Sequence, residues 1–308
     1  MYEEFFGLSR SPFQLSPDPS FVVATSQAKE VLSAIYYGVS GRKGFAVLTG
    51  EVGTGKTLIV RCLLELLRRQ KIPCANVFNP KLSPFDFLRY VAFDLRIRLE
   101  QPTKGDLLQA LYKFLLSQLQ LGLTTVIIVD EAHQLSPAVL EEIRLLTNLE
   151  TAQQKLLQVL LVGQPEFDAT LESFEFRQLK QRIAIRCNLE PLNRDSTTLY
   201  VNRRLVLAGA KSDPDSIFPE PTIDAIYRYS GGVPRVINNV CDQALTAGFA
   251  RQTITITSGI IQEVARHLKL RAFTTDQTGK PISPSLEQVT AARALLQNLH
   301  PLYKVRSS

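Results

Sequence analysis

The sequence has few of the features that mark secreted, metal-binding or membrane-spanning proteins. Its 308 residues include only four cysteines, which stand far apart without C-x-x-C spacing, so neither a disulfide framework nor a zinc site is expected. No run approaches the roughly 18 to 20 uncharged apolar residues that span a bilayer. The first residues lack the basic start and apolar stretch of a signal peptide. We therefore expect a cytoplasmic protein in which Cys62, Cys74, Cys187 and Cys241 are buried thiols.

The excess of positive charge is also small. Thirty-five Lys and Arg residues face 29 Asp and Glu residues, a net charge of +6, which is low for a protein that wraps DNA. From Arg266 to the end of the chain there are seven basic residues and two acidic ones, so most of the excess lies in this tail. Such a tail is compatible with nucleic acid, an anionic lipid surface, an acidic patch on another protomer, or plain exposure to solvent.

Short apolar runs alternate with helical patterns through the first 190 residues. Strands are expected at 45–49, 74–78, 124–129, 156–162 and 184–189, and helices at 26–39, 58–70, 84–98, 104–120, 137–149 and within 167–182. The β-branched run at 124–129 suits a central parallel strand that is covered on both faces. The repeated strand–helix units predict an α/β fold in which helices sandwich a parallel sheet.

The rest of the chain has a different pattern. Helices without further strands are expected at 196–208, 221–229, 234–250 and 258–267, then a linker at 270–284 and a short amphipathic helix over Leu286, Val289, Leu295, Leu296 and Leu299. Three prolines among phenylalanines in the first twenty residues predict an ordered, docked leader rather than a helix. The expected parts are a leader with a docking helix (1–40), an α/β core (41–190), a helical domain (191–268), and a linker with a terminal helix (269–308).

The strongest motif lies between the first strand and the helix that follows it. It is the phosphate-binding loop pattern, read from Gly50, Glu51, Val52, Gly53, Thr54, Gly55, Lys56 and Thr57, with Leu58 continuing the helix. Glycines at 53 and 55 let successive backbone N–H groups face a phosphate chain, and the helix start adds the positive end of its dipole. Lys56 would contact the β and γ phosphates of ATP, and the Thr57 hydroxyl would hold Mg²⁺.

A second motif ends the strand at 124–129 with two adjacent carboxylates. Side chains alternate along a strand, so Asp130 and Glu131 are expected to have different roles. Asp130 would bind Mg²⁺ through its hydration shell, and Glu131 would orient and deprotonate the water that attacks the γ phosphate. His133 lies two residues further on, where it would either sense the γ phosphate or start a helix. A general base at this position favours ATP hydrolysis over a nucleotide-dependent scaffold without turnover.

Together these motifs resemble the AAA+ ATPases, and more narrowly the group that contains the secretion ATPase ExeA (GspA) and the transposition ATPases TniB and TnsC. The residues that carry the resemblance are the leader with Tyr2, Phe5 to Leu8, Pro12-Phe13 and Pro17-Asp-Pro19, Asp130-Glu-Ala-His133, Leu161 to Glu166, Gln178 to Ile183, Gly231 to Asn238, and Cys241-Asp242. The resemblance covers about residues 1 to 268. It implies a P-loop NTPase core followed by a small helical AAA+ lid domain.

The resemblance also implies roles for residues outside the two motifs. Gln164 matches the sensor-1 position after the strand at 156–162, although many AAA+ proteins have Asn, Ser or Thr there. Arg182 matches the arginine finger that acts across a subunit interface, with Arg177 as a second candidate, and Arg235 matches sensor 2 in the lid. The leader resembles a segment that packs near the adenine. A finger acting in trans implies an ATP-dependent homo-oligomer that hydrolysis weakens.

Two interpretations of the partner remain open. An ExeA-like ATPase would drive assembly of an export or envelope system. Such proteins often continue into a transmembrane helix and a peptidoglycan-binding domain. Neither is evident in this sequence, so we expect a partner protein at the inner membrane. A TniB- or TnsC-like regulator would assemble on duplex DNA, with Lys81, Arg89, Arg96 and Arg98 as candidate phosphate contacts. The small net charge and the leader favour the export interpretation.

Overall fold

The computed structural model describes residues 2–14, 21, 23–78, 81–210 and 213–273. These residues form two compact units. One contains an α/β sheet and is built from residues 28–51 and 59–189. The other is helical and, among the described residues, combines the leader, the phosphate-loop residues 52–58, and residues 190–273. The linker and terminal helix expected at 270–284 and 286–299 lie outside the described residues, apart from the first few linker positions.

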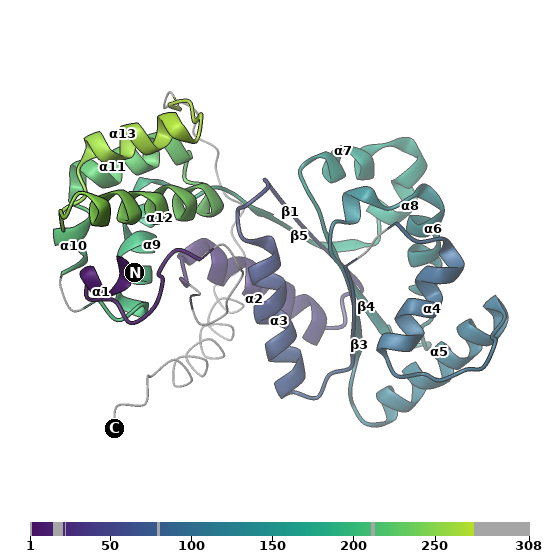
Figure 1. The fold of residues 1–308 in the computed structure, drawn as a ribbon. Coiled ribbons are helices and arrows are strands. Elements are labelled where there is room, and N and C mark those ends of the chain that lie inside the picture. Colours follow the sequence, from purple (N-terminus) through teal and green to yellow (C-terminus); the bar gives the residue numbers. More distant parts are fainter. Residues whose placement is uncertain (1, 15–20, 22, 79–80, 211–212, 274–308) are drawn as a thin grey trace, which may run out of the picture. The chain divides into compact units, whose positions relative to one another are not determined.

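The α/β unit is built on a five-stranded parallel sheet with the order β2-β3-β4-β1-β5 (Figure 1). Its strands are β1 (Phe45–Gly50), β2 (Cys74–Val77), β3 (Thr125–Val129), β4 (Leu157–Val162) and β5 (Ile183–Leu189). β3 is an interior strand between β2 and β4, and every one of its residues is buried, as its unbroken β-branched run predicts. The register pairs Phe45 with Val159 of β4 and with Ile183 of β5, so the strands begin at one common edge and end at the other.

Helices cover both faces of this sheet because alternate strand residues point to opposite sides. On one face lie α2 (Ser26–Ser40) and α3 (Lys56–Arg69), packed on a cluster that includes Ala46, Leu48, Val126 and Ile128. On the other lie α4 (Pro84–Asp94), α5 (Lys104–Gln120), α6 (Pro137–Leu146) and α7 (Glu166–Glu172), packed on a cluster that includes Val47, Val77, Ile127 and Val129. The predicted α/β sandwich is confirmed.

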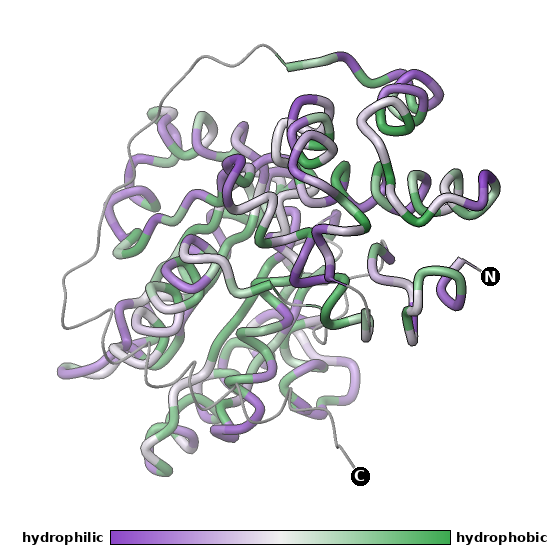
Figure 2. Tube along the Cα trace, turned by 90° about the vertical axis from the view of Figure 1, so that its left-hand side faces the viewer, coloured by the Kyte–Doolittle hydropathy of each residue, from purple (hydrophilic) through white to green (hydrophobic). Residues whose placement is uncertain are grey.

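The helical unit has its own core. It contains α9 (Arg194–Leu207), α10 (Pro214–Ile217), α11 (Glu220–Ser230), α12 (Pro234–Ala250) and α13 (Ser258–His267). Hydrophobic and hydrophilic residues alternate along the chain in Figure 2, and the hydrophobic residues of these helices bury a cluster that includes Val201, Ile226, Ile237 and Ile261. The predicted small all-helical domain is likewise confirmed.

The leader docks on the helical unit, as predicted, through both apolar and polar contacts. Phe6, Phe13 and Phe21 are buried in its core. The Tyr2 hydroxyl donates to Asp242 at 2.5 Å, and burial together with this bond raises the pKa of Tyr2. Arg204 is buried and donates from Nε to the Pro12 carbonyl at 2.5 Å. Phe13 therefore belongs to the docking interface.

Several predicted boundaries differ from the structure. The leader contains one helical turn, α1 (Tyr2–Phe5), where no helix was expected. The helix expected to reach Arg98 ends at Asp94, because Arg96 takes a left-handed conformation with φ 61° and the Ile97 amide bonds back to the Ala92 carbonyl. The helix expected to reach Leu149 ends at Leu146, since the hydroxyl of the next residue, a threonine, bonds to a carbonyl of the last turn.

Candidate functional site

The phosphate loop has the strand-and-helix context that its motif requires. β1 ends at Gly50 and α3 begins at Lys56. Gly53 and Gly55 have φ values of +85° and +108°, which side-chain-bearing residues rarely adopt. Thr54 and Lys56 are buried, and Thr57 is exposed at the helix start. Two glycines with positive φ directly before the start of a helix are typical of a phosphate-binding loop.

Arg235 lies directly against this loop within the helical unit. Its backbone amide donates to the Gly53 carbonyl at 3.2 Å, and its side chain is exposed. A Cβ atom at position 53 would approach the Arg235 Cβ to 2.7 Å, so only glycine allows α12 to begin here. The preceding Gly232 has a similar constraint, because a Cβ there would meet the Leu192 carbonyl oxygen at 1.8 Å. The Gly-Gly-Val-Pro-Arg motif thus brings an arginine to the phosphate loop through two glycine-dependent contacts.

The carboxylate pair lies immediately past β3. The Asp130 amide donates to the Val77 carbonyl at 2.9 Å, which extends the β2–β3 ladder by one bond. Asp130 Oδ1 then accepts the Glu131 amide at 2.9 Å. Glu131 takes a left-handed conformation, φ 56° and ψ 36°, and its side chain is 42% exposed. Asp130 thus bonds to the backbone of the turn, whereas the Glu131 side chain lies 3.6 Å from His133 Nε2.

The His133 side chain contacts both the residue past the end of β4, Gln164, and Glu131 in this turn. His133 Nε2 lies 3.1 Å from Gln164 Nε2, within hydrogen-bond distance, and 3.6 Å from Glu131 Oε2. Its Nδ1 is buried without a hydrogen-bond partner among the described residues. The structure therefore brings together three side chains, from the turn after β3, the short helix η2 (Ala132–Gln134), and the end of β4. The sequence pattern placed Glu131 and Gln164 at separate strand ends and left the role of His133 open.

One residue of each unit carries an oxygen donor of the kind that would hold magnesium. The Thr57 hydroxyl and the Asp130 carboxylate are oxygen ligands, which Mg²⁺ prefers. Within the described ranges no group of three or more His, Cys, Asp or Glu residues could hold a metal ion. Since Mg²⁺ is commonly bound by one or two protein oxygens, waters and substrate phosphates, these residues suit a metal that arrives with ATP.

Arg182 lies at the opposite edge of the sheet. It directly precedes β5, whereas the phosphate loop follows the far end of β1. The six residues of β1 span about 20 Å at about 3.3 Å per residue, so the first residue of β5 and the last of β1 are well separated. Arg182 Nη1 donates to the Thr147 hydroxyl at 2.9 Å. Arg177, the second candidate finger, stacks its guanidinium 4.0 Å from the centroid of the exposed Phe174 ring.

The cysteines take no part in this site. Cys241 is buried as expected, but Cys62, Cys74 and Cys187 are only partly buried, because they lie at the borders of the apolar clusters. Burial nevertheless raises the pKa of Cys62 and of Cys187 to about 11. A raised pKa disfavours the thiolate, which is the nucleophilic form of cysteine.

Comparison with known proteins identifies the fold. Residues 39–171 match the family described as AAA domain. The chain is an AAA+ protein. It is 42% identical over 266 residues to general secretion pathway protein A of Aeromonas hydrophila, covering 86% of this chain and 48% of that protein. It is 28% identical over 179 residues to the ATP-dependent target DNA activator B of Escherichia phage Mu, covering 55% of this chain and 52% of the activator.

The structural comparison agrees with the AAA+ assignment. Cdc6p from Pyrobaculum aerophilum superimposes with a TM-score of 0.61 at 16% identity, over 86% of this chain and 70% of that one. The resemblance predicted from the motifs is therefore confirmed at the level of fold and family. The chain spans about half the length of the curated relatives it matches. In the part of this AAA+ protein that the structure describes, no helix is both long and apolar enough to cross a bilayer.

Proposed function

We propose that this AAA+ protein binds ATP with Mg²⁺ and hydrolyses it at the contact between two copies of the chain. The observation that carries the proposal is the cluster of Glu131, His133 and Gln164 past the ends of two neighbouring strands. A phosphate loop alone would bind nucleotide, whereas a general base held beside two polar groups favours turnover.

The proposal assigns the individual residues the roles that the motifs and the family resemblance imply. Backbone amides of residues 50–58 would hold the phosphates, and Lys56 would neutralise the β and γ oxygens. Thr57 and Asp130 would hold Mg²⁺, which supplies charge neutralisation at the transferred phosphoryl group. Glu131 would orient and deprotonate the attacking water, with Gln164 and His133 fixing its direction. Arg235 would contact the nucleotide from the helical unit, since its backbone already bonds to Gly53.

Arg182 completes the site from a second copy. Because it lies about 20 Å from the end of β1 along the sheet, it is poorly placed to contact the nucleotide of its own chain. The γ phosphate would then stabilise the assembled form, and hydrolysis would weaken it. ATP binding thus becomes a signal for homo-oligomer assembly.

The partner that this assembly acts on is a component of an export or envelope system. The support is the 42% identity to general secretion pathway protein A over most of the chain. Under this interpretation the protein works in the cytoplasm, in contact with a membrane-bound partner. The identity extends through both units and so includes the helical one, where a partner would sense the nucleotide state.

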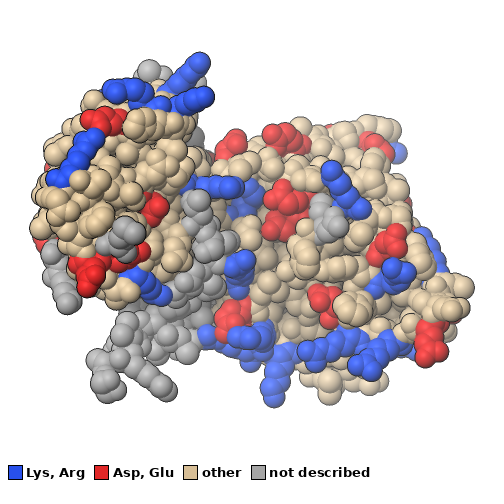
Figure 3. All heavy atoms as spheres, in the orientation of Figure 1, with Lys and Arg blue, Asp and Glu red and all other residues tan. Residues whose placement is uncertain are grey.

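A second candidate function is ATP-dependent regulation of transposition on duplex DNA. The match to the phage Mu target DNA activator favours it, and Figure 3 shows Lys and Arg side chains gathered in a band along one border of the α/β unit. Of the predicted phosphate contacts, Arg96 and Arg98 lie exposed beyond the end of α4, and Arg89 is within 3.9 Å of Asp86.

The experiment that tests the proposal is ATP turnover measured against protein concentration, with Glu131→Gln as the inactive control. Specific activity that rises with concentration supports hydrolysis between copies, and a flat curve contradicts it. The same assay with duplex DNA at low and physiological salt separates the two partners. Stimulation by DNA that salt abolishes favours the transposition interpretation, because phosphate contacts release counterions. Indifference to DNA favours the export interpretation.

A further inference from the structure

Arg182 is one of three cations that precede neighbouring strands at the same edge of the sheet. Lys155 lies two residues before β4, Lys43 two residues before β1, and Arg182 one residue before β5. Since these strands are adjacent in the order β4-β1-β5 and all parallel, their starting ends place the three residues side by side. In the sequence Lys43 and Lys155 are 112 positions apart, and Lys155 and Arg182 are 27 positions apart.

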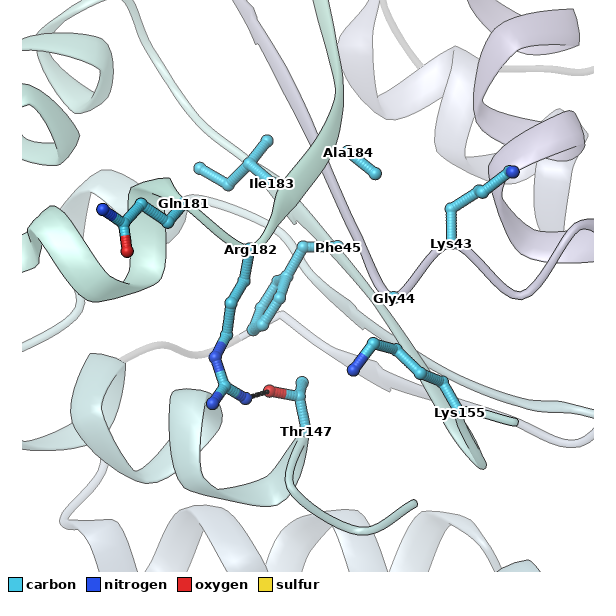
Figure 4. Close-up of a pocket in the computed structure, with 9 residues that line it drawn as sticks. All are labelled: Lys43, Gly44, Phe45, Thr147, Lys155, Gln181, Arg182, Ile183 and Ala184. Atoms are coloured by element: carbon cyan, nitrogen blue, oxygen red, sulfur yellow. Dashed lines mark hydrogen bonds between the residues drawn. The ribbon is translucent and has the colours of Figure 1, made fainter. Parts of the chain in front are cut away.

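These residues line a cavity of about 340 Å³, which we call the sheet-edge pocket. Its other lining residues are Gly44, Phe45, Thr147, Gln181, Ile183 and Ala184. Figure 4 shows the Lys155 ammonium and the Arg182 guanidinium directed toward the same hollow beside Phe45. Lys43 points away from it, with its ammonium 5.7 Å from the Tyr37 ring centroid. The pocket therefore presents two positive charges rather than three.

The chain holds both cations in place. Arg182 is positioned by Thr147, a buried residue whose own hydroxyl donates to the Arg144 carbonyl at 2.7 Å. Lys155 is positioned by a backbone bridge to Glu150 across a tight turn. Arg42 anchors this turn, because its guanidinium donates to the side-chain oxygen of Gln154 at 2.6 Å.

Gly44 makes room for the Lys155 side chain. It has φ +92°, and a Cβ atom there would lie 3.0 Å from Lys155 Cδ. The aliphatic part of Lys155 thus passes over a bare backbone. A side chain at position 44 would crowd Lys155 along this path.

Lys155 has a partner that it can exchange. Its ammonium lies 2.7 Å from Glu150 Oε2 in a pair where both side chains are more than one third exposed. The hydrogen bond and charge of Lys155 lower the pKa of Glu150, and Arg182 contributes to the same shift. Exposed ion pairs are weak and readily exchanged, so a more highly charged anion entering the pocket would compete for Lys155.

We propose that the sheet-edge pocket binds the terminal phosphate of ATP held by a second copy of the chain, and that Lys155 leaves Glu150 to act there beside Arg182. This inference rests on the proposed function. A phosphate carries more charge and more acceptor oxygens than a carboxylate, and it accommodates one guanidinium and one ammonium at once. Lys155 is thus a second cationic group that makes assembly specific for the triphosphate.

The first test measures ATP-dependent assembly in the Glu131→Gln background, where nucleotide is bound without being consumed. The molar mass is followed by analytical ultracentrifugation with ATP, with ADP and without nucleotide. Lys155→Ala should raise the protein concentration at half-assembly about tenfold with ATP, and should have no effect with ADP. Lys43→Ala is the matched control and should behave as the parent. Glu150→Gln should favour assembly, because it releases Lys155.

Three outcomes would overturn the inference. Equal weakening with ATP and ADP would mean that Lys155 pairs with an acidic side chain of the second copy instead of a phosphate. No effect of Lys155→Ala would remove Lys155 from the contact. An equal effect of Lys43→Ala would mean that general surface charge, and not the pocket, drives assembly. Melting curves of each variant identify any loss that comes from misfolding.

A mixing experiment separates failure of this inference from failure of the proposed function. Arg182→Ala has an intact phosphate loop, and Lys56→Ala has an intact sheet-edge pocket, so mixing the two should restore turnover if the site lies between copies. If mixing restores nothing, the proposed function fails. If mixing does restore turnover, the proposed function stands and Lys155 is judged by its own variant. Should Lys155→Ala alone already be fully active, so that adding Lys56→Ala brings no gain, only the role of Lys155 is lost.

Discussion

Replacing Arg204 by methionine should release the leader from the helical unit. The guanidinium is buried and donates to the Pro12 carbonyl at 2.5 Å and to the Tyr200 hydroxyl at 2.6 Å. It also lies 5.0 Å from the Phe21 ring centroid. Methionine keeps most of the aliphatic volume but removes every donor, so the change isolates the polar contribution.

The size of the effect follows from those contacts. A hydrogen bond from a charged group contributes about 1.5–3 kcal/mol, and a buried acceptor left unpaired costs about 1–3 kcal/mol. Undocking of the leader would let water reach the Pro12 carbonyl, so the full sum is not reached. We expect a loss of about 3 kcal/mol, which corresponds to a melting temperature about 6–12 °C lower.

The assay is thermal unfolding of Arg204→Met beside Arg203→Met, which removes an exposed arginine from the same helix. Limited proteolysis should cut the leader of Arg204→Met faster than that of the control. Equal melting temperatures and equal cleavage for the two variants would refute the reasoning. They would mean that the buried phenylalanines alone dock the leader.

Further expectations concern the active site, alkaline pH and thiol reactivity. Gln164→Ala and His133→Ala should each lower kcat about tenfold with little change in KM. The double variant should lose little more, because both residues act on the same base. Additive losses of the two single variants would contradict a shared action on Glu131. The pKa of Tyr2 is raised in the folded state, so leader docking should be intact below about pH 10 and weaken as the pH rises above it. Tyr2→Phe should lose this pH dependence, and a wild-type pH profile equal to that of the variant would contradict the expectation. Cys62 and Cys187, with pKa values raised to about 11, should react with iodoacetamide at pH 8 more than tenfold slower than a free thiol, and rates equal to those of unfolded protein would refute this.

Much of the fold could be predicted because its signals are local. The buried run before Asp130, the helix at Lys104–Gln120 with its Thr103–Asp106 capping box, and the glycine-rich loop each specify their own structure. The helix ends at Asp94 and Leu146 were harder, since neither is marked by glycine or proline. In the first case Arg96, an arginine, takes the left-handed conformation that usually signals glycine.

Local sequence patterns named Gln164 and His133 but did not reveal contacts between distant segments. His133 and Gln164 are 31 positions apart and meet only because β3 and β4 are neighbours in the sheet. Arg204 reads as an ordinary surface arginine on a helix, yet it bonds to a carbonyl 192 positions away. No local pattern distinguishes Arg204 from the exposed Arg203 beside it.

The contact between Gly53 and Arg235 changes how variants of the phosphate loop should be interpreted. Any side chain at position 53 would displace the start of α12 as well as strain the loop, so a Gly53 variant alters nucleotide affinity and lid docking in one step. Its phenotype cannot be divided between the two causes. Lys56 variants leave that backbone junction intact and are the cleaner tool for separating nucleotide loss from mechanical uncoupling. The same main-chain bond offers a direct route by which the proposed hydrolysis, if it changed the loop conformation, would move the start of α12 without any side chain taking part.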